Sequence, residues 1–211
     1  MLTEIIPVIH MVNEDQVFAN VNTCIKCGIK KVFIINHVVS VEELLDCAYK
    51  VKSAYNLLWV GVNMLGLTAE QALTRSLLNL DGIWSDSSLE PAQTYLYQYY
   101  KRIHKGMFFG GVSFKYQPQP IDLKSACELS KLTTSVATTS GSGTGQSPTT
   151  YKIKLIREYL GEHPMAIASG ISSENIHLYK DLANYLLVST SITDKNEFII
   201  EEKLMELKSK I

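Results

Sequence analysis

Eight short apolar runs, separated by longer amphipathic stretches, constrain the fold of this chain more than any other feature. They recur roughly every 25 residues and cover 5–10, 31–36, 56–63, 81–85, 107–114, 133–139, 163–169 and 183–191. The second run, KVFIIN, is continuously apolar and rich in β-branched residues, as is typical of a parallel strand buried on both faces. The pattern predicts eight parallel strands joined by helices.

The stretches between the runs carry helix start and stop signals. Ser40 with Glu43, and Thr68 with Gln71, have the spacing of capping boxes, and Asp122 precedes a further helical pattern. The signals and the apolar spacing predict a first helix that ends at Gly28. They predict further helices over 41–54, 69–79, 91–103, 123–131, 149–160, 172–182 and 197–208.

A (β/α)8 TIM barrel, a fold of the α/β class, consists of eight strand–helix pairs, and the pattern predicts that number. We therefore expect residues 1–211 to form a single barrel domain with short loops. A doubly wound open sheet is the alternative architecture. It usually has a glycine-rich turn after its first strand, and the corresponding segment here, MVNED, contains no glycine.

Charge and targeting signals narrow the class of protein. The 20 basic and 21 acidic side chains give a formal net charge of −1, which argues against a dedicated nucleic-acid binder. The chain has no signal-peptide pattern, and no apolar run approaches the ~18 residues of a membrane span. We expect a cytoplasmic protein that binds neither nucleic acid nor membrane.

The four cysteines are expected to be reduced thiols in that compartment. Cys24 and Cys27 form a CxxC motif, but it falls near the end of a helical pattern. A redox motif would open a helix after a strand. The pair is therefore interpreted as structural, and the sequence shows no cysteine or histidine cluster with the spacing of a metal site.

In a barrel of this type the active site lies at the carboxyl ends of the strands. Polar residues at those positions are candidates for acid–base chemistry, namely His10, Asp86 and Lys115. Lys115 has two alternative roles, pairing with an anionic group or forming a Schiff base, and Asp86 has the alternative role of capping the next helix. Three further strand-end residues are predicted to orient a ligand: Asn36, Asn63 and Thr139.

Glycine and hydroxyl residues gather after the last three strands. The segment SGSGTGQSP, residues 140–148, has backbone N–H groups that can approach an anion closely, although a flexible linker is its alternative interpretation. Phosphate sites of TIM barrels are commonly built from the loops after the seventh and eighth strands. The predicted phosphate-binding residues are Gly143, Thr144, Gly145, Ser169, Gly170, Ser189 and Thr190.

Several motifs together resemble the BtpA family of (β/α)8 barrels, which is named for a photosystem I biogenesis protein. They are GTGQSP, PMAIASGISSENI and YLLVSTSI in the last third, with PVIH at 7–10, GVN at 61–63 and the lysine of VSFKY at 112–116. The resemblance implies a barrel of the ribulose-phosphate-binding type with a phosphate site.

The chain departs from these patterns at positions that matter for chemistry. The family usually has an acidic residue where this chain has Ile35 and Asn36, and an Asp and a His where it has Gly111 and Ser113. The GTG and SG motifs are also similar to those of phosphoribosylanthranilate isomerase, which implies a catalytic Cys and Asp. The segments PVIHM and VATTS contain neither, which argues against that isomerisation.

Two classes of function follow from the sequence. The first is an enzyme, an isomerase, lyase or transferase, acting on a sugar phosphate or nucleotide fragment. The second is a non-catalytic barrel that serves in assembly or sensing, or a protein-interaction module that uses the tyrosine-rich segment TYLYQYYKRIHK, whose surplus tyrosines suggest a homo-oligomer. The sequence leaves magnesium open as a cofactor and selects no substrate or reaction.

Overall fold

The computed structural model describes residues 2–75 and 80–211. The strands are β1 (Glu4–Met11), β2 (Lys31–Asn36), β3 (Trp59–Asn63), β4 (Gly82–Ser85), β5 (Met107–Gly111), β6 (Val136–Ser140), β7 (Met165–Ala168) and β8 (Tyr185–Val188). The α-helices are α1 (Glu14–Lys26), α2 (Val41–Ala54), α3 (Ala69–Thr74), α4 (Thr94–Ile103), α5 (Leu123–Thr133), α6 (Thr150–Leu160) and α7 (Glu201–Lys208).

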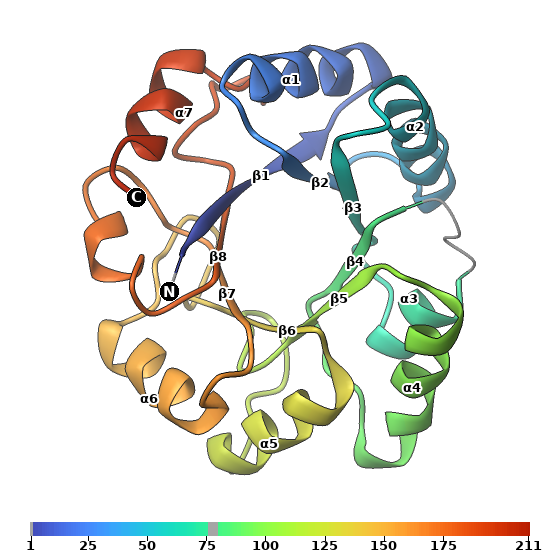
Figure 1. The fold of residues 1–211 in the computed structure, drawn as a ribbon, viewed down its shortest axis with the longest axis vertical. Helices are drawn as coiled ribbons and strands as arrows, with labels where there is room; N and C mark the ends of the chain where they lie inside the picture. The colour runs from blue at the N-terminus through green and yellow to red at the C-terminus, as the bar shows by residue number, and fades with distance from the viewer. Residues whose placement is uncertain (1, 76–79) are drawn as a thin grey trace.

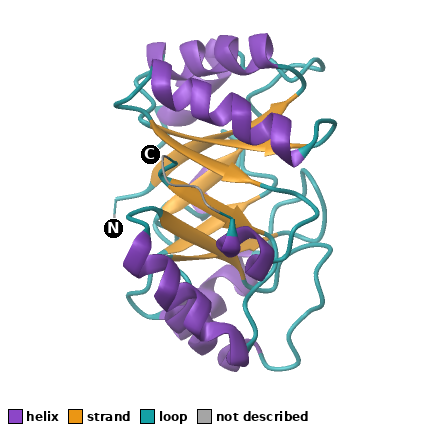
Figure 2. Ribbon diagram, turned by 90° about the vertical axis from the view of Figure 1, so that its right-hand side faces the viewer, coloured by secondary structure: helices purple, strands orange, loops and turns teal. Residues whose placement is uncertain are grey.

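The strands form a closed parallel barrel in chain order, which confirms the predicted TIM-barrel fold. β1 pairs with β2 through Val8 and Phe33, and with β8 through Glu4 and Tyr185, so the sheet has no free edge. The helices form an outer ring around the strands (Figure 1). In the side view, the strand arrows point toward the end of the barrel that carries the long loops (Figure 2).

Side chains on the two faces of each strand fill two separate apolar layers. Along β1, Ile5 and Ile9 pack in the layer between strands and helices, whereas Ile6 and Val8 point into the barrel. Inside the barrel, the Phe33 ring packs edge-on against three aromatic rings, with centroids 5.2 Å from Trp59, 5.6 Å from Trp84 and 5.0 Å from Phe109. The interior is thus a packed core, and space for a ligand exists only at the ends.

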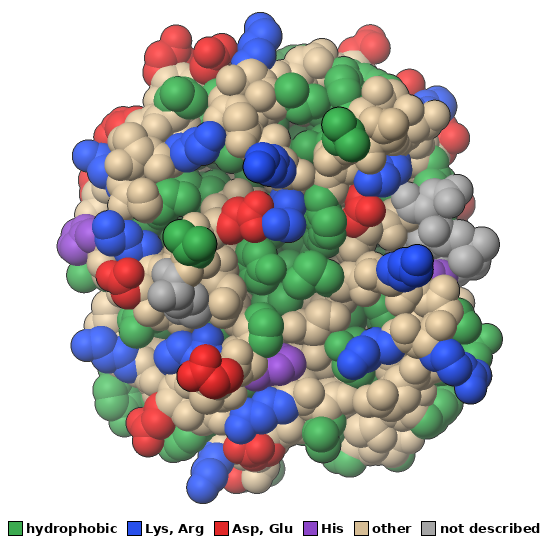
Figure 3. All heavy atoms as spheres, viewed as in Figure 1, with side chains coloured by type: hydrophobic (Ala, Val, Ile, Leu, Met, Phe, Trp, Pro, Cys, Tyr) green, Lys and Arg blue, Asp and Glu red, His purple; other side chains and the backbone are tan. Residues whose placement is uncertain are grey.

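The end at which the strands begin is a mixed, charged surface. Basic and acidic side chains are intermingled on this face (Figure 3). Lys31 pairs with Glu4 here, and Lys52 Nζ lies 2.6 Å from Asp81 Oδ2. This intermingling agrees with the nearly balanced charge of the whole chain. Among the described helices, none has the length and apolar character needed to cross a bilayer.

Three helix predictions need correction or lie partly outside the described residues. The segment 172–182 contains only a 3-10 turn, Ile176–Leu178, because the Asn175 side chain accepts from the Ser172 backbone N–H and donates to the Gly170 carbonyl instead of capping a helix. The last helix begins at Glu201, not Glu197, because Thr193 and Ile199 form a β-bridge that holds the preceding loop. The predicted helix 69–79 is observed as Ala69–Thr74, and 76–79 lie outside the described residues.

The four cysteines are free thiols buried in the packing layers. Burial, with Cys27 nearby, raises the pKa of the Cys24 thiol to about 12. A thiol in that state is neither a good nucleophile nor a metal ligand at neutral pH. This agrees with the structural interpretation of the CxxC motif.

Candidate functional site

A cavity of about 170 Å³ lies at the carboxyl ends of the strands, and all eight strands or the loops after them contribute to it. Its floor is apolar and is the upper layer of the barrel interior, formed by Val8, Ile35, Ala168 and Leu187. Polar groups stand around this floor. They include the three predicted acid–base residues and six of the predicted phosphate-binding residues: His10, Asp86, Lys115, Thr144, Gly145, Ser169, Gly170, Ser189 and Thr190.

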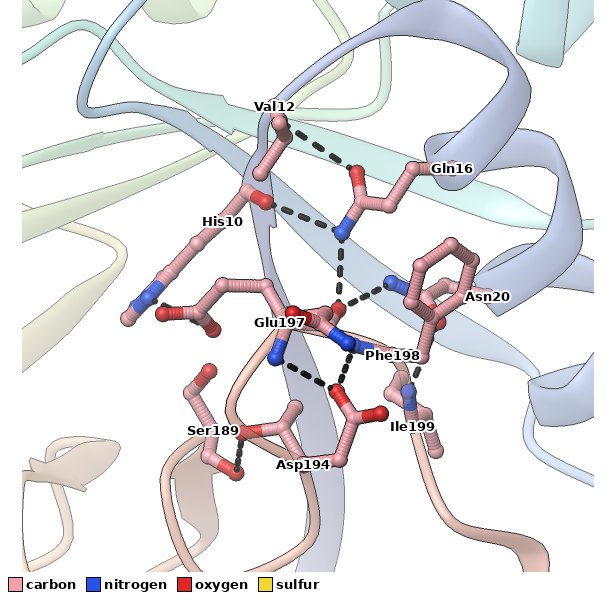
Figure 4. Close-up of polar contacts among 11 residues, drawn as sticks. His10, Val12, Gln16, Asn20, Ser189, Asp194, Glu197, Phe198 and Ile199 are labelled. Carbon is pink, nitrogen blue, oxygen red and sulfur yellow. Dashed lines mark hydrogen bonds and ion pairs between the residues drawn. The ribbon is translucent and has the colours of Figure 1, made fainter.

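His10, near the end of β1, has two ionisable neighbours. Its Nδ1 atom lies 3.2 Å from Glu197 Oε2 (Figure 4). Its ring centroid lies 4.4 Å from that of His37, which follows β2. Burial, followed by the proximity of His10, lowers the pKa of His37 below its ordinary value of 6.5. The cavity therefore holds a second imidazole that favours the neutral form, and neutral imidazole can accept a proton.

Glu197 is held in place by the first helix. Its backbone carbonyl accepts hydrogen bonds from Gln16 Nε2 at 2.7 Å and from Asn20 Nδ2 at 2.8 Å (Figure 4). Glu197 adopts a left-handed φ of 63°, which is uncommon for a residue with a side chain. Asp194 fixes the turn by accepting from the backbone N–H of Phe198 at 2.9 Å. The loop after β8 thus aims one carboxylate at His10.

Asp86 directly follows β4 and lines the cavity. Burial raises the pKa of its carboxyl group above the ordinary 3.8, whereas a hydrogen bond from Asn63 and the charge of Lys115 act in the other direction. Asn63 Nδ2 donates to Asp86 Oδ1 at 3.0 Å. The helix-capping alternative for Asp86 is not observed, because the residue before the turn that leads into α4 is Glu90.

Lys115 reaches the predicted phosphate loops. Its Nζ atom donates to Ser169 Oγ at 2.9 Å and to Thr144 Oγ1 at 3.3 Å, which joins the loops after β5, β6 and β7. Burial lowers the pKa of Lys115, with Asp86 and Tyr116 opposing the shift. Within the described residues, no carboxylate oxygen lies within 4 Å of this ammonium. A half-buried cation surrounded by hydroxyl groups can bind an anion.

The glycine-rich loops pack backbone against backbone. Gly170 has a left-handed φ of 67°, and a Cβ atom there would overlap the backbone nitrogen of Ser147. Gly145 is also left-handed, with a φ of 73°, but has open space around it. Only glycine allows the loop after β7 to approach the loop after β6 so closely. This approach brings Thr144 and Ser169 onto the same ammonium.

Two polar atoms on the cavity wall have no protein partner. Trp84 Nε1 and Ser189 Oγ are buried, and neither has a hydrogen bond within the described residues. Buried polar groups are otherwise almost always paired. A donor and a hydroxyl without partners, on the wall of a cavity, are therefore available to a ligand.

The residues predicted to orient a ligand lie behind the cavity wall. Asn36 Oδ1 accepts from the Leu65 backbone N–H at 2.8 Å, and Thr139 Oγ1 donates to the Ser113 carbonyl at 3.4 Å. Asn63 contacts Asp86. None of the three lines the cavity, and neither does Gly143. Asn36, Asn63 and Thr139 therefore hold the loops and Asp86 in place, and their contact with a ligand stays a prediction.

The structure adds residues that the sequence analysis did not select. His37 directly follows Asn36 at the end of β2, so the strand-end rule could have found it. Tyr116 accepts a hydrogen bond from the Thr144 backbone N–H at 3.1 Å, and hydrogen bonds to Thr144 lower its pKa. Glu197 had no signal in the sequence, because it lies in the loop after β8 and reaches the site through side-chain contacts with α1.

A metal centre has no obvious ligand set here. In the part of the chain that the structure describes, no three His, Cys, Asp or Glu side chains gather as a metal site would require.

Comparisons with known proteins give similarity of fold without close sequence relatives. No family model and no curated protein sequence matches this chain. The structure is similar to 3-hexulose-6-phosphate synthase from Salmonella typhimurium, with a TM-score of 0.75 and 14% identity over 98% of this chain and 97% of that chain. It is also similar to phosphoribosyl anthranilate isomerase from Thermus thermophilus, with a TM-score of 0.69 and 13% identity over 98% and 97% of the two chains.

A third similar structure is KDPG aldolase from Legionella pneumophila, with a TM-score of 0.69 and 14% identity over 98% of this chain and 94% of that chain. The three are an isomerase, a synthase and an aldolase by name, and at these identities they share the TIM-barrel fold with this chain.

Proposed function

We propose that this protein binds a phosphorylated small molecule, such as a sugar phosphate or a nucleotide fragment, at the carboxyl ends of its strands and performs acid–base chemistry on it. The observation that carries this proposal is the position of Lys115 Nζ between Ser169 Oγ and Thr144 Oγ1, with no carboxylate oxygen of the described residues within 4 Å of it. An ammonium and two hydroxyl groups are natural ligands of a phosphate. The resemblance to the BtpA family and the names of the similar structures agree with this class of ligand.

In this proposal the two sides of the cavity have different roles. Lys115, Ser169 and the backbone around Gly170 hold the phosphate. His10, oriented by Glu197, exchanges a proton with the ligand, because an imidazole suits proton transfer near neutral pH. Asp86, whose pKa is raised by burial, is the second proton-transfer group.

Ligand binding is tested by thermal shift and calorimetry with phosphate, sugar phosphates, phosphoribosyl compounds and nucleoside monophosphates, with and without magnesium. A ligand at ~100 times its dissociation constant adds about 2.7 kcal/mol of stability. Lys115→Met should lose this shift. The matched control is Lys154→Met, since Lys154 is exposed on α6 outside the cavity. No shift with any phosphate compound would contradict the proposal.

Catalysis is tested separately from binding. A ligand found in the screen is incubated with the protein in D2O, and NMR follows exchange of its C–H protons. Exchange that is lost in His10→Gln, with binding retained, is expected for the enzyme. Binding without exchange in the unmodified protein would favour the non-catalytic assembly or sensing function.

A second candidate property is self-association through α4. Tyr95 and Tyr99 are 62% and 53% exposed on this helix, and Arg102 lies over the Tyr99 ring at 5.4 Å. Exposed aromatic side chains beside arginine are enriched at protein interfaces. We propose a cytoplasmic homo-oligomer, which agrees with the four free thiols, and mass measurement in solution of Tyr99→Glu tests it.

A further inference from the structure

Three cavities adjoin at the carboxyl ends of the strands. The central cavity described above shares Asp86 with a cavity of about 510 Å³. It shares Lys115 and Tyr116 with a cavity of about 450 Å³ between the loops after β5 and β6 and the start of α6, and the two outer cavities both touch Ser113 and Gln119. A ligand bound centrally can therefore extend toward either neighbour.

The two outer cavities have opposite charge. The 510 Å³ cavity is lined by Glu70, Asp86 and Glu90, and by no Lys or Arg. The 450 Å³ cavity, which we call the lysine cavity, is lined by Lys115 and Lys152, and by no Asp or Glu. A negatively charged part of a ligand is thus repelled by the acidic side chains of the 510 Å³ cavity and attracted by the two ammonium groups of the lysine cavity.

Lys152 is a cation that pairs with no acidic side chain among residues 2–75 and 80–211. Its Nζ atom donates to the Ser113 carbonyl at 2.6 Å and to the Ser140 carbonyl at 2.8 Å, and burial lowers its pKa. Across the described residues, no carboxylate lies within 4 Å of it. Neutral carbonyl groups satisfy two of its three donors but leave its charge uncompensated.

Hydroxyl groups complete the surroundings. Ser142 and Thr149 line the lysine cavity, and Thr149 is the N-cap residue of α6, so the positive end of that helix points to the same space. Tyr116 lines both this cavity and the central one. The composition of the lysine cavity, with two ammonium groups and several hydroxyl groups, suits an anion.

We infer that the lysine cavity is a second anion subsite, so that the ligand carries two anionic groups. This inference rests on the proposed function: one phosphate occupies the central cavity, and a second phosphate or a carboxylate occupies the lysine cavity. Lys152 contacts the second group alone, whereas Lys115 stands between the two groups. The substrate class is a short sugar or sugar-acid chain with a phosphate at one end and an anion at the other.

Isothermal titration calorimetry with three probes tests this inference. Ribulose 5-phosphate carries one phosphate, ribulose 1,5-bisphosphate carries two, and 6-phosphogluconate carries a phosphate and a carboxylate. We expect at least one of the probes with two anionic groups to bind about tenfold or more tightly than ribulose 5-phosphate, since charge-assisted contacts of this kind are strong. The probe with the larger gain identifies the second group as phosphate or carboxylate.

Two variants locate the effect. Lys152→Met keeps the length of the side chain but removes its charge, and should bring the affinity of the probe with two anionic groups close to that of ribulose 5-phosphate. Ser142→Asp puts a negative charge into the lysine cavity at an exposed loop position, where folding is tolerant, and should have the same effect. Lys154→Met, on the exposed side of the same helix, should leave all affinities unchanged.

The outcomes separate this inference from the proposed function. Binding of ribulose 5-phosphate with no gain in affinity for either probe with two anionic groups overturns the second subsite and leaves the phosphate site standing. A gain that survives both Lys152→Met and Ser142→Asp also overturns it, because the second group then binds elsewhere. If none of the probes binds, and the wider phosphate panel also gives no shift, the proposed function fails together with the inference.

Discussion

Glu197 Oε2 lies 3.2 Å from His10 Nδ1, although the two residues come from opposite ends of the chain. The separation is that of an ion pair, and Glu197 Oε2 is a buried atom that makes no hydrogen bond with the described residues. Closure of the barrel between β8 and β1 makes the contact possible. With Nδ1 facing the carboxylate, Nε2 is the nitrogen left for a ligand.

The first prediction concerns the tautomer of His10. Glu197→Ala should raise the fraction of imidazole protonated at Nε2, because the acceptor beside Nδ1 is lost. Glu197→Gln keeps an oxygen acceptor and should preserve the Nδ1–H tautomer. The ¹⁵N chemical shifts of the His10 ring measure both. Identical shifts in the Ala variant and the unmodified protein would rule out a positioning role, and phosphate affinity should stay unchanged in both variants.

The fold could be predicted because its signals are local and agree with one another. β2 at Lys31–Asn36 and α2 at Val41–Ala54 have the predicted bounds. The strand is continuously apolar, and the helix begins at Ser40, whose side chain and that of Glu43 make both bonds of a capping box. At 172–182 the prediction was wrong because Asn175 forms a local turn, a competition that composition does not resolve.

The positions of the site residues were predictable only where they follow from the barrel itself. His10, Asp86 and Lys115 lie at strand ends, and a parallel barrel brings all such ends to one face. Glu197 could not be found in this way, because Gln16 and Asn20 place it from a distant helix. The sequence also does not show how deeply a side chain is buried. Asn36 and Thr139 lie at strand ends as predicted, but they form hydrogen bonds with Leu65 and Ser113 behind the cavity.

The second prediction is that Asp86→Asn stabilises the protein at neutral pH. Burial raises the pKa of Asp86 above 3.8, so the ionised form costs stability in the folded state. The folded protein binds the proton more tightly than the unfolded chain, so this cost is present at neutral pH and fades as pH falls through the raised pKa. Each kcal/mol gained should raise Tm by about 2–4 °C for a chain of this size.

The Tm of Asp86→Asn is compared with the Tm of the unmodified protein from about pH 4 to pH 8. The matched control is Asp181→Asn, an exposed carboxylate outside the cavity, which should have no effect. A gain in stability with loss of ligand proton exchange is the signature of a carboxyl group kept for function. Destabilisation of Asp86→Asn at neutral pH would show instead that the charge supports the fold.

The third prediction concerns mild acid. The pKa of His37 is lowered from 6.5 by burial and by His10, so the unfolded chain binds more protons than the folded protein below that value. The part of the free energy of unfolding that depends on neutral His37 should therefore be fully present above pH 6.5 and should be lost as the pH drops through the lowered pKa. His37→Asn should lose less stability on acidification than the unmodified protein.

His163 serves as the comparison for this measurement. Its pKa is also lowered, by burial first and then by Arg157 and Lys131, but it lies outside the site, with Nε2 3.1 Å from Thr134 Oγ1. Urea midpoints as a function of pH should show separate, additive contributions from the two histidines. Equal acid sensitivity of His37→Asn and the unmodified protein would assign the whole effect to other groups.

The fourth prediction compares three glycines that all have a left-handed φ, at 67° for Gly170, 73° for Gly145 and 60° for Gly161. An alanine at Gly145 meets no atom within 4 Å, so it should cost about 1 kcal/mol for the backbone conformation alone. Gly161 also has open space around it, but its ψ of −120° lies outside the left-handed helical region, so an alanine there should cost more than at Gly145. An alanine at Gly170 also overlaps the Ser147 backbone, and should cost ~3 kcal/mol or more. Urea unfolding measures all three.

The same three variants relate the loop approach to ligand binding. Gly170→Ala must push the loop after β7 away from the loop after β6, which separates Ser169 from Thr144 and removes one hydroxyl from Lys115. It should therefore lower phosphate affinity even under conditions where it is folded. Gly161→Ala, at the far end of α6, should keep full affinity despite a measurable loss of stability. If Gly170→Ala binds phosphate normally, the close approach of the two loops serves the fold alone.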